Sequence, residues 1–314
     1  MSDTKKTKII LDVDPGHDDA VAIMLAGKHP KIDLQAITVV AGNQILEKTA
    51  KNAINVCSYL GINKVPVAVG MSRPMVREQV IADDIHGETG LDGPVFGEPT
   101  VQLEQKHAID LIIELLMRSN GDITLVPTGP LTNIGMAIRR EPRIIPKIKQ
   151  IVLMGGSYQL GNITPAAEFN IYADPEAAHV VFTCGRPIVM IGLDLTRQAL
   201  VTKEVMDRIR TIGNDASRLF VSLMEFFSRT QKEVFGLEAP PLHDPTTIAY
   251  LIDPSIIQTK PMNVQIELRS DASYGRTLCD YFGMLHKPAN AEVAVKLDFN
   301  KFWNTVYETI KLYS

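Results

Sequence analysis

The stretch Ile9-Ile-Leu-Asp-Val-Asp-Pro-Gly-His-Asp-Asp-Ala20 decides the fold, because it predicts a buried strand, a tight turn and the start of a helix. Residues 9–13 are apolar apart from one aspartate, which is typical of a strand covered on both faces. A Pro-Gly turn follows, and residues 20–28 then have the spacing of an amphipathic helix. A strand that leads directly into a helix is the repeating unit of parallel α/β sheets.

The same alternation continues along the chain. Strands are predicted at 37–40, 123–126, 151–154 and 188–191, and helices at 48–60, 108–117, 131–138 and 175–183. After Val201 the pattern is mostly helical through Leu251, and strands at 264–268, 275–279 and 293–297 precede a closing helix from Lys301. Since no linker, repeat or low-complexity segment interrupts this pattern, we predict one α/β domain over residues 1–314, with a mostly parallel sheet flanked by helices.

The composition narrows the functional classes. With 45% hydrophobic and 22% charged residues, the chain is typical of a soluble globular protein. Its formal charge of −4 gives no electrostatic reason to expect a nucleic-acid partner, and no run of about 18 apolar residues predicts a membrane span. The three cysteines show no paired spacing, and no secretory apolar segment is present, so we expect a cytoplasmic protein.

Four aspartates in eight residues, Asp12, Asp14, Asp18 and Asp19, follow the first strand. Asp12 and Asp14 share one face of the strand, and the turn brings the other two back toward the strand end. Two carboxylates about 4 Å apart repel by roughly 4 kcal/mol at an effective dielectric near 20, so a cation or raised pKa values must offset the repulsion. We expect a hard divalent cation held by oxygens. The alternative is that Asp18 or Asp19 caps the helix and the others face water.

Two further stretches are candidates for the same site. Asp244, between His243 and Pro245, offers another carboxylate, although Asp-Pro is also a routine helix start with Asp as the N-cap. Glu168 and Asn170 flank Phe169, so in an extended segment they would point the same way and suit sugar hydroxyls. A polar surface loop is the alternative for that pair.

Three weaker signals also lie in loops. Asn43 follows the second strand, His86 lies in a glycine-flanked loop, and Thr128 follows another strand, where its backbone carbonyl is available. The glycine-rich stretch 155–161 matches neither the dinucleotide nor the phosphate-loop motif. Ligands of open α/β sheets bind at the carboxyl ends of strands, which is where these polar residues are predicted.

Together, the aspartate motif of residues 12–19, Glu168-Phe-Asn170 and His243-Asp244-Pro245 resemble the inosine-uridine nucleoside hydrolase family, from Lys8 to the helix after Asn300. Residues 85–96 and 274–280 are similar to the bacterial pyrimidine-specific ribonucleoside hydrolases. The resemblance implies a single α/β domain with a Rossmann-like core. It also implies hydrolysis of ribonucleosides, chiefly uridine and cytidine, to ribose and free base, by an enzyme that forms dimers or tetramers.

The resemblance further implies roles for matching positions. Asp14 corresponds to the general base, acting on a calcium-bound water, and His86 and His243 lie at the nucleobase end. One Ca²⁺ per subunit is held by Asp14, Asp19, Asp244 and the carbonyl of Thr128. The substrate pocket comprises Asp18, Asn43, Asn162, Glu168, Asn170, Gln231 and Phe235. Relatives in the pyrimidine branch have tyrosine where this chain has Phe235, so a hydroxyl donor is missing here.

Elementary chemistry agrees with these roles. Cleavage of an N-glycosidic bond builds positive charge on the ribose and negative charge on the departing base. Carboxylates therefore belong at one end of the site and hydrogen-bond donors at the other, and direct attack by water inverts the anomeric centre.

Three alternatives stay open on sequence. The first is a broader inosine-uridine-preferring hydrolase. The second is a haloacid-dehalogenase-like phosphatase, which also begins with Asp-x-Asp but has threonine or valine where this chain has Gly16. The third is a non-catalytic calcium-dependent nucleoside or sugar binder, since fold does not fix function. Release of ribose or of phosphate separates the first two.

Overall fold

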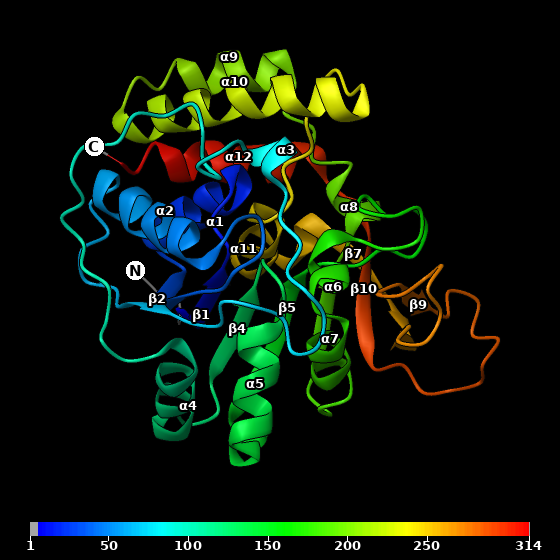
Figure 1. Ribbon diagram of the computed structural model, residues 1–314. Helices are drawn as coiled ribbons and strands as arrows, with labels where there is room; N and C mark the ends of the chain where they lie inside the picture. The colour runs from blue at the N-terminus through cyan, green and yellow to red at the C-terminus, as the bar shows by residue number, and fades with distance from the viewer. Residues whose placement is uncertain (1–5, 314) are drawn as a thin grey trace.

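An eight-stranded sheet forms the centre of the computed structural model, which describes residues 6–313, so the predicted 1–314 domain extends beyond the described residues (Figure 1). The strand order is β3-β2-β1-β4-β5-β6-β10-β7, and every neighbouring pair is parallel except β10 and β7. The strands are β1 (Thr7–Val13), β2 (Ile32–Val39), β3 (Val67–Val69), β4 (Ile123–Pro127), β5 (Ile148–Met154), β6 (Ile188–Ile191), β7 (Ile257–Met262) and β10 (Ala291–Leu297). This arrangement confirms the predicted mostly parallel α/β sheet.

Two strands of this sheet, β3 and β7, are absent from the sequence prediction. Both lie at sheet edges. β3 has only three residues, and β7 contains Pro261 and is buried only at its end residues Ile257 and Met262, so neither shows a long apolar run. The predicted strands near 264 and 275 form a separate antiparallel pair, β8 (Val264–Ile266) and β9 (Thr277–Cys279).

Helices cover both faces of the large sheet (Figure 1). Side chains of β1 alternate between two apolar clusters: Ile9, Leu11 and Val13 belong to one, and Ile10 to the other. The first cluster includes α1 (His17–Lys28), α2 (Leu46–Tyr59), α9 (Lys203–Arg210), α10 (Asp215–Phe235), α11 (Pro245–Ile252) and α12 (Phe299–Ile310). The second includes α4 (Ala108–Arg118), α5 (Thr132–Arg140) and α7 (Pro175–Phe182).

The remaining short helices are α3 (Asp83–His86), α6 (Phe169–Ala173), α8 (Leu193–Thr196) and the 3-10 turns η1 (Pro142–Lys147) and η2 (Pro254–Ile256). Among the described residues, no helix combines the length and the apolarity that crossing a bilayer requires.

The order of the strands places a crevice at the ends of β1 and β4. From β1 the chain winds outward through β2 to β3, and it then returns to β4 on the other side of β1 and continues to β5 and β6. In doubly wound sheets the point where the winding direction changes leaves room for a ligand outside the carboxyl ends of the strands. Asp14 directly follows β1, and Thr128 directly follows β4.

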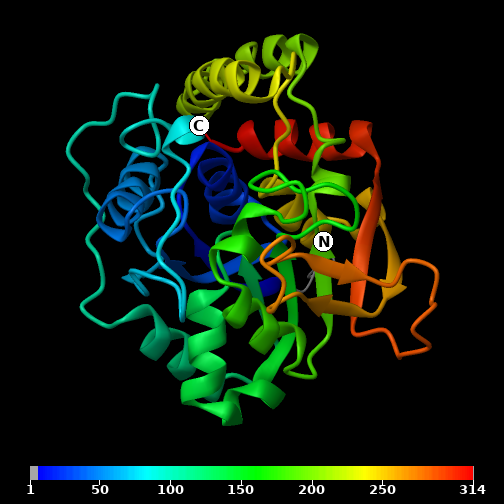
Figure 2. The same ribbon diagram turned by 45° about the vertical axis from the view of Figure 1, so that its right-hand side comes forward.

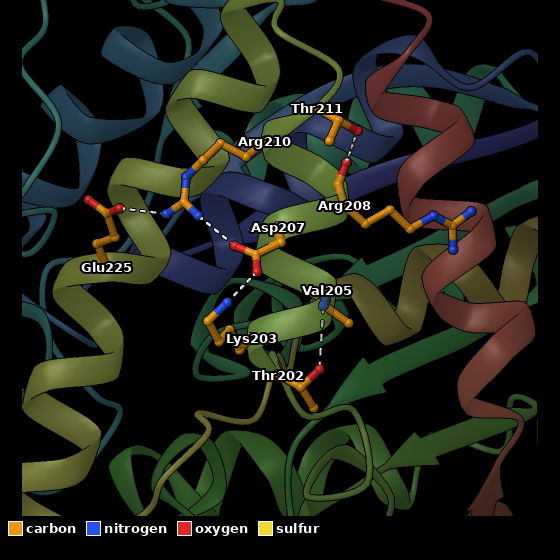
Figure 3. A network of polar contacts seen from close by, with 8 residues as sticks. All are labelled: Thr202, Lys203, Val205, Asp207, Arg208, Arg210, Thr211 and Glu225. Atoms are coloured by element: carbon orange, nitrogen blue, oxygen red, sulfur yellow. Dashed lines mark hydrogen bonds and ion pairs between the residues drawn. The ribbon is translucent and has the colours of Figure 1, made fainter.

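Helix α10 lies across one side of the molecule, next to α9 (Figures 1 and 2). Arg210 of α9 contacts Asp207 at 3.0 Å and Glu225 of α10 at 2.9 Å (Figure 3). These half-exposed ion pairs each contribute at most about 1 kcal/mol, so burial of Phe220 and Phe227 holds α10 in place. The C-terminal half of α10 thereby reaches the crevice.

Asn133, a fully buried residue of α5, ties three segments together. Its Nδ2 donates to Oδ1 of Asp12 at 2.8 Å and to the carbonyl oxygen of Val39 at 3.1 Å, and its Oδ1 accepts from the amide of Met71 at 2.9 Å. The single side chain therefore links α5 to β1, to β2 and to the segment after β3.

We predict that Asn133→Ala lowers the free energy of unfolding by about 2–3 kcal/mol, because it leaves buried hydrogen-bonding groups without partners. Urea denaturation followed by circular dichroism measures the change. Asn120→Ala, at an exposed loop position, is the matched control and is expected to change stability by at most about 0.5 kcal/mol. Equal effects of the two substitutions would contradict this role for Asn133.

Candidate functional site

Buried carboxylates gather where β1 ends and α1 begins. Helix α1 starts at His17 with Gly16 as its N-cap, so Asp18 and Asp19 lie in the first turn. Asp19 takes part in capping the helix, because its Oδ2 accepts from the amide of Gly16 at 3.1 Å, but it is buried with the other acids. Asp244, from the start of α11, joins them: ligand oxygens of Asp18, Asp19 and Asp244 all lie within 4.8 Å of one another. The N-terminal aspartates and Asp244 were predicted to lie together, and this group joins residues that are more than 220 positions apart. It contains Asp18, however, where the predicted set of metal ligands has Asp14.

Asp244 does not act as an ordinary helix cap. Although it precedes Pro245 at the first position of α11, its side chain accepts no capping hydrogen bond, so the routine helix-start interpretation fails here. By contrast, Asp174 does cap α7, since its Oδ1 accepts from the amide of Ala177 at 3.0 Å. The carboxylate of Asp244 is thus left available to the acidic cluster.

Asp14 is held in a narrow slot. The amide of Asn43 donates to its Oδ2 at 2.7 Å, while its buried Oδ1 has no hydrogen-bond partner among residues 6–313. Two glycines line the slot: a Cβ added at Gly42 would lie 2.1 Å from Oδ2, and one added at Gly129 would lie 2.4 Å from Oδ1. No larger residue fits at either position without displacing the carboxylate, and one oxygen of Asp14 is left free to bind.

Burial and mutual repulsion disfavour ionisation of these groups. Desolvation, followed by the charge of Asp19, raises the pKa of Asp14 well above its usual range, and the same two causes raise the pKa of Asp18 to about 7. Burial and then the charges of neighbouring aspartates raise the pKa of Asp244. A cation at this cluster would remove the penalty, and the donor set of carboxylate oxygens fits a hard divalent ion.

A second group of polar residues surrounds the segment 162–170. Glu168 is the N-cap of α6, where it accepts from the amides of Asn170 at 2.9 Å and Ile171 at 3.2 Å. The segment is not extended, because the helix begins at Phe169, so the condition under which Glu168 and Asn170 would point the same way is not met. Asn170 nevertheless turns back to the strand ends, where its Nδ2 donates to the carbonyl oxygen of Thr128 at 2.6 Å. Burial raises the pKa of Glu168 to about 7.

Two histidines, His86 and His243, and residues of α10 also line the cavity. His243 Nδ1 lies 2.7 Å from Oγ1 of Thr196, and burial lowers the pKa of His243 to about 4. Gln231 is 5% exposed, whereas Phe235 is 45% exposed at the end of α10, so its ring lies at the mouth of the cavity. Burial also lowers the pKa of His86, so the imidazoles of His86 and His243 are predominantly neutral near pH 7.

One cavity of about 100 Å³ collects almost all of the predicted site residues. Its lining includes Asp18, Asn43, His86, Thr128, Asn162, Glu168, Asn170, Gln231, Phe235, His243 and Asp244. The two exceptions, Asp14 and Asp19, are fully buried behind this surface, where Asp19 Oδ1 accepts from the amide of Asp14 at 3.3 Å. The same lining therefore combines carboxylates, amides, imidazoles and aromatic rings.

Sequence reasoning missed several residues of the site. His17 is fully buried and contacts His86, and Phe227 lines the cavity from α10. His17 lies within the aspartate motif, which indicated that it is close to the site. Its contacts could not be predicted, because the residues that it contacts lie far away in the sequence. The slot glycines, Gly42 and Gly129, were not among the predicted site residues.

Comparisons with known proteins agree with this geometry. A sequence model of the family described as Inosine-uridine preferring nucleoside hydrolase matches residues 9–304. The chain is 57% identical over 309 residues to the pyrimidine-specific ribonucleoside hydrolase RihB of Escherichia coli O17:K52:H18, with 98% of each chain covered. Its fold is similar to that of a purine-preferring ribonucleoside hydrolase from Gardnerella vaginalis, with a TM-score of 0.90, 32% identity and coverage of 97% and 98% of the two chains.

A plant nucleoside hydrolase, PpNRh1, is similar to the same degree, with a TM-score of 0.90, 30% identity and coverage of 97% and 99%. These matches span nearly the whole chain. The chain therefore belongs to the inosine-uridine preferring nucleoside hydrolase family and is an enzyme that acts on N-glycosidic bonds.

Proposed function

We propose that this enzyme hydrolyses pyrimidine ribonucleosides, uridine and cytidine, to ribose and free base, with Asp14 as the general base and one Ca²⁺ per subunit. The observation that carries the proposal is that the carboxylates of Asp18, Glu168 and Asp244 and the imidazoles of His86 and His243 line one cavity. The pyrimidine preference is supported by the 57% identity to a pyrimidine-specific relative. A broader inosine-uridine preference is the second candidate, because the family model carries that description.

In this proposal the calcium ligands are Asp14, Asp19, Asp244 and the carbonyl oxygen of Thr128. Three observations support the fit: the unpartnered buried Oδ1 of Asp14, the absence of a capping bond at Asp244, and the raised pKa values of the cluster. When bound, the ion would orient the attacking water and the ribose hydroxyls, and it would lower the pKa of that water.

Asp14 accepts the proton of the attacking water at Oδ1. The slot between Gly42 and Gly129 and the amide of Asn43 fix its carboxylate, so little reorganisation accompanies the proton transfer. As the glycosidic bond breaks, the positive charge that develops on the ribose faces the anionic end of the cavity.

The ribose is oriented by side chains from three segments of the chain. Asp18, Asn43, Asn162, Glu168 and Asn170 line the cavity around the carboxylate end. Glu168 and Asn170 are themselves held by hydrogen bonds to α6 and to the carbonyl of Thr128, which pre-organises them. At the other end, His243 and Gln231 hydrogen-bond to the departing base, and Phe235 stacks on it.

We also propose a cytoplasmic homo-oligomer, a dimer or a tetramer. Phe282 is 83% exposed and Met284 is 76% exposed in a loop that Asp280 orders by accepting from the amides of Met284 and Leu285, both at 2.8 Å. Exposed apolar groups on an ordered loop favour burial against another chain.

Steady-state kinetics with uridine, cytidine, inosine and adenosine tests the function directly. We expect ribose release from all that react, with kcat/KM for uridine and cytidine at least about tenfold above that for inosine, a difference of about 1.4 kcal/mol in transition-state binding. Equal or higher kcat/KM for inosine would replace the pyrimidine assignment by the broader one. Turnover of a phosphate ester without ribose release would refute the proposal altogether.

Asp14→Ala tests the general base. Turnover is expected to fall by about 10²–10⁴-fold because no other carboxylate occupies the slot, while uridine binding persists through Glu168 and the asparagines. Calorimetry at saturating Ca²⁺ measures binding, and Asp271→Ala, in an exposed loop, is the control with unchanged turnover. Near-normal turnover of Asp14→Ala would remove Asp14 from the mechanism.

Phe235→Tyr tests the missing hydroxyl at the cavity mouth. If donation to the departing base limits the rate, the added O–H raises kcat for uridine several-fold, because a donor then stabilises negative charge on the base. The ring itself is conserved in size, so KM is expected to change little. Unchanged kcat would show that Gln231 and His243 already supply sufficient stabilisation.

A further inference from the structure

The loop of residues 158–167, between β5 and α6, contributes Asn162 to the lining of the cavity. It contains no helix or strand, and it lies beside α8 (Figure 1). Within the loop, the amide of Gly161 donates to the carbonyl oxygen of Pro165 at 3.2 Å, and the amide of Asn162 donates to that of Ala167 at 3.1 Å. These bonds close a tight turn around Asn162, but they do not connect the turn to any other element.

Arg197, the residue after α8, supplies a connection. Its Nη1 donates to the carbonyl oxygen of Leu160 at 3.1 Å, and its Nη2 donates to that of Gly161 at 2.7 Å. Among residues 6–313 it is the only side chain outside the loop that donates to a loop carbonyl, and no carboxylate oxygen of these residues lies close enough to form an ion pair with it. The guanidinium group therefore serves the two carbonyls that directly precede Asn162.

Helix α8 also holds the start of the same loop, by separate contacts. Oδ2 of Asp194 accepts from the amide of Tyr158 at 2.6 Å, and the amide of Leu193 donates to the carbonyl oxygen of Gly156 at 2.9 Å. Loss of the Arg197 side chain would leave these contacts in place and release only the turn. Since hydrogen bonds from a guanidinium are stronger than those between neutral groups, this release would be the main effect.

The turn sets the direction in which the amide group of Asn162 points. Its Oδ1 accepts from the amide of Phe169 at 2.9 Å, and its Nδ2 has no hydrogen-bond partner within residues 6–313. Nδ2 is therefore available as a donor to a ligand in the cavity. Phe169 directly follows Glu168, whose carboxylate lines the same cavity. A sugar hydroxyl both donates and accepts, so it fits a neighbouring donor and acceptor better than a base carbonyl, which only accepts.

We propose that Arg197 is a positioning residue for sugar recognition, because its two hydrogen bonds fix the turn so that Nδ2 of Asn162 donates to a ribose hydroxyl. Arg197 is not among the residues that line the cavity, so it acts through Asn162. The proposal rests on the proposed function, since it takes a ribonucleoside as the ligand. It does not depend on the base preference, because uridine, cytidine, inosine and adenosine share the same sugar.

The test combines kinetics, ribose binding and hydrogen exchange on the full chain. Arg197→Met removes both donors and keeps an unbranched side chain, whereas Arg197→Lys keeps the charge and a donor. Arg208→Met is the matched control, because Arg208 is exposed, donates to Asn304 and does not line the cavity. Asn162→Ala, alone and combined with Arg197→Met, shows whether Arg197 acts through Asn162.

We expect Arg197→Met to raise KM for the most reactive of the four nucleosides about tenfold and to change kcat by less than about twofold, because the lost interaction binds substrate and transition state alike. The dissociation constant of free ribose, measured by calorimetry at saturating Ca²⁺, rises by the same factor. Arg197→Lys restores most of the loss, and Arg208→Met has no effect. In the Asn162→Ala background, Arg197→Met raises KM by less than about a further twofold.

Hydrogen exchange without substrate is expected to be faster in residues 158–167 of Arg197→Met and unchanged in the rest of the protein. Unchanged exchange in the loop, an unchanged KM or ribose affinity, or a further tenfold rise in KM in the Asn162→Ala background would overturn the proposal. If the wild type itself hydrolysed no nucleoside, the proposed function would fail. The exchange measurement needs no turnover, so the two failures are distinguishable.

Discussion

The arrangement of the site depends on one electrostatic constraint, which is the burial of several carboxylates within a few ångströms of one another. Asp14, Asp19 and Asp244 are at most 3% exposed, and burial raises the pKa values of all three carboxyl groups. The charges of neighbouring aspartates raise the pKa values of Asp14 and Asp244 further. Such a cluster is destabilising when ionised without a counter-charge, and a divalent cation converts the same oxygens into ligands. The same carboxylates therefore supply the negative charge that binds the ion and the negative charge that faces the ribose during bond cleavage.

The fold brings these groups together through the switch in winding direction at β1. Asp14 follows β1, the glycine of its slot at position 42 follows β2, and Gly129 follows β4, so three neighbouring strand ends shape the surroundings of one carboxylate. The parallel sheet sets these positions with little freedom, because β1 pairs with both neighbours. Asp244 reaches the same point from α11, which packs on α1.

Local patterns in the sequence predicted much of this fold and part of the site. The central strands are continuous apolar runs, so they were found, whereas the edge strands β3 and β7 lack that pattern and were missed. The aspartates of residues 12–19 are adjacent in sequence, so their proximity followed from a strand and a turn. The helix that begins at Phe169 depends on tertiary contacts, and so does the lack of a capping hydrogen bond at Asp244. The family resemblance, and not the spacing of residues, indicated that Asp244 belongs to the site.

His17 illustrates why the rest could not be predicted. Its partners, His86, Asp92 and the phenylalanines of α10, lie between 69 and about 210 residues away along the chain, so no local pattern records the contacts. A motif can show that a residue is near the chemistry. Only the packed structure shows which of its atoms face a donor or an acceptor, and this determines what the residue does.

The most direct test of the central claim is anomalous diffraction from crystals grown with calcium, compared with crystals of protein dialysed against a chelator. The account predicts one anomalous peak per chain in the calcium crystals, bounded by oxygens of Asp14, Asp19 and Asp244 and by the carbonyl of Thr128, and no peak after chelation. A calcium crystal with no peak among these oxygens would contradict it.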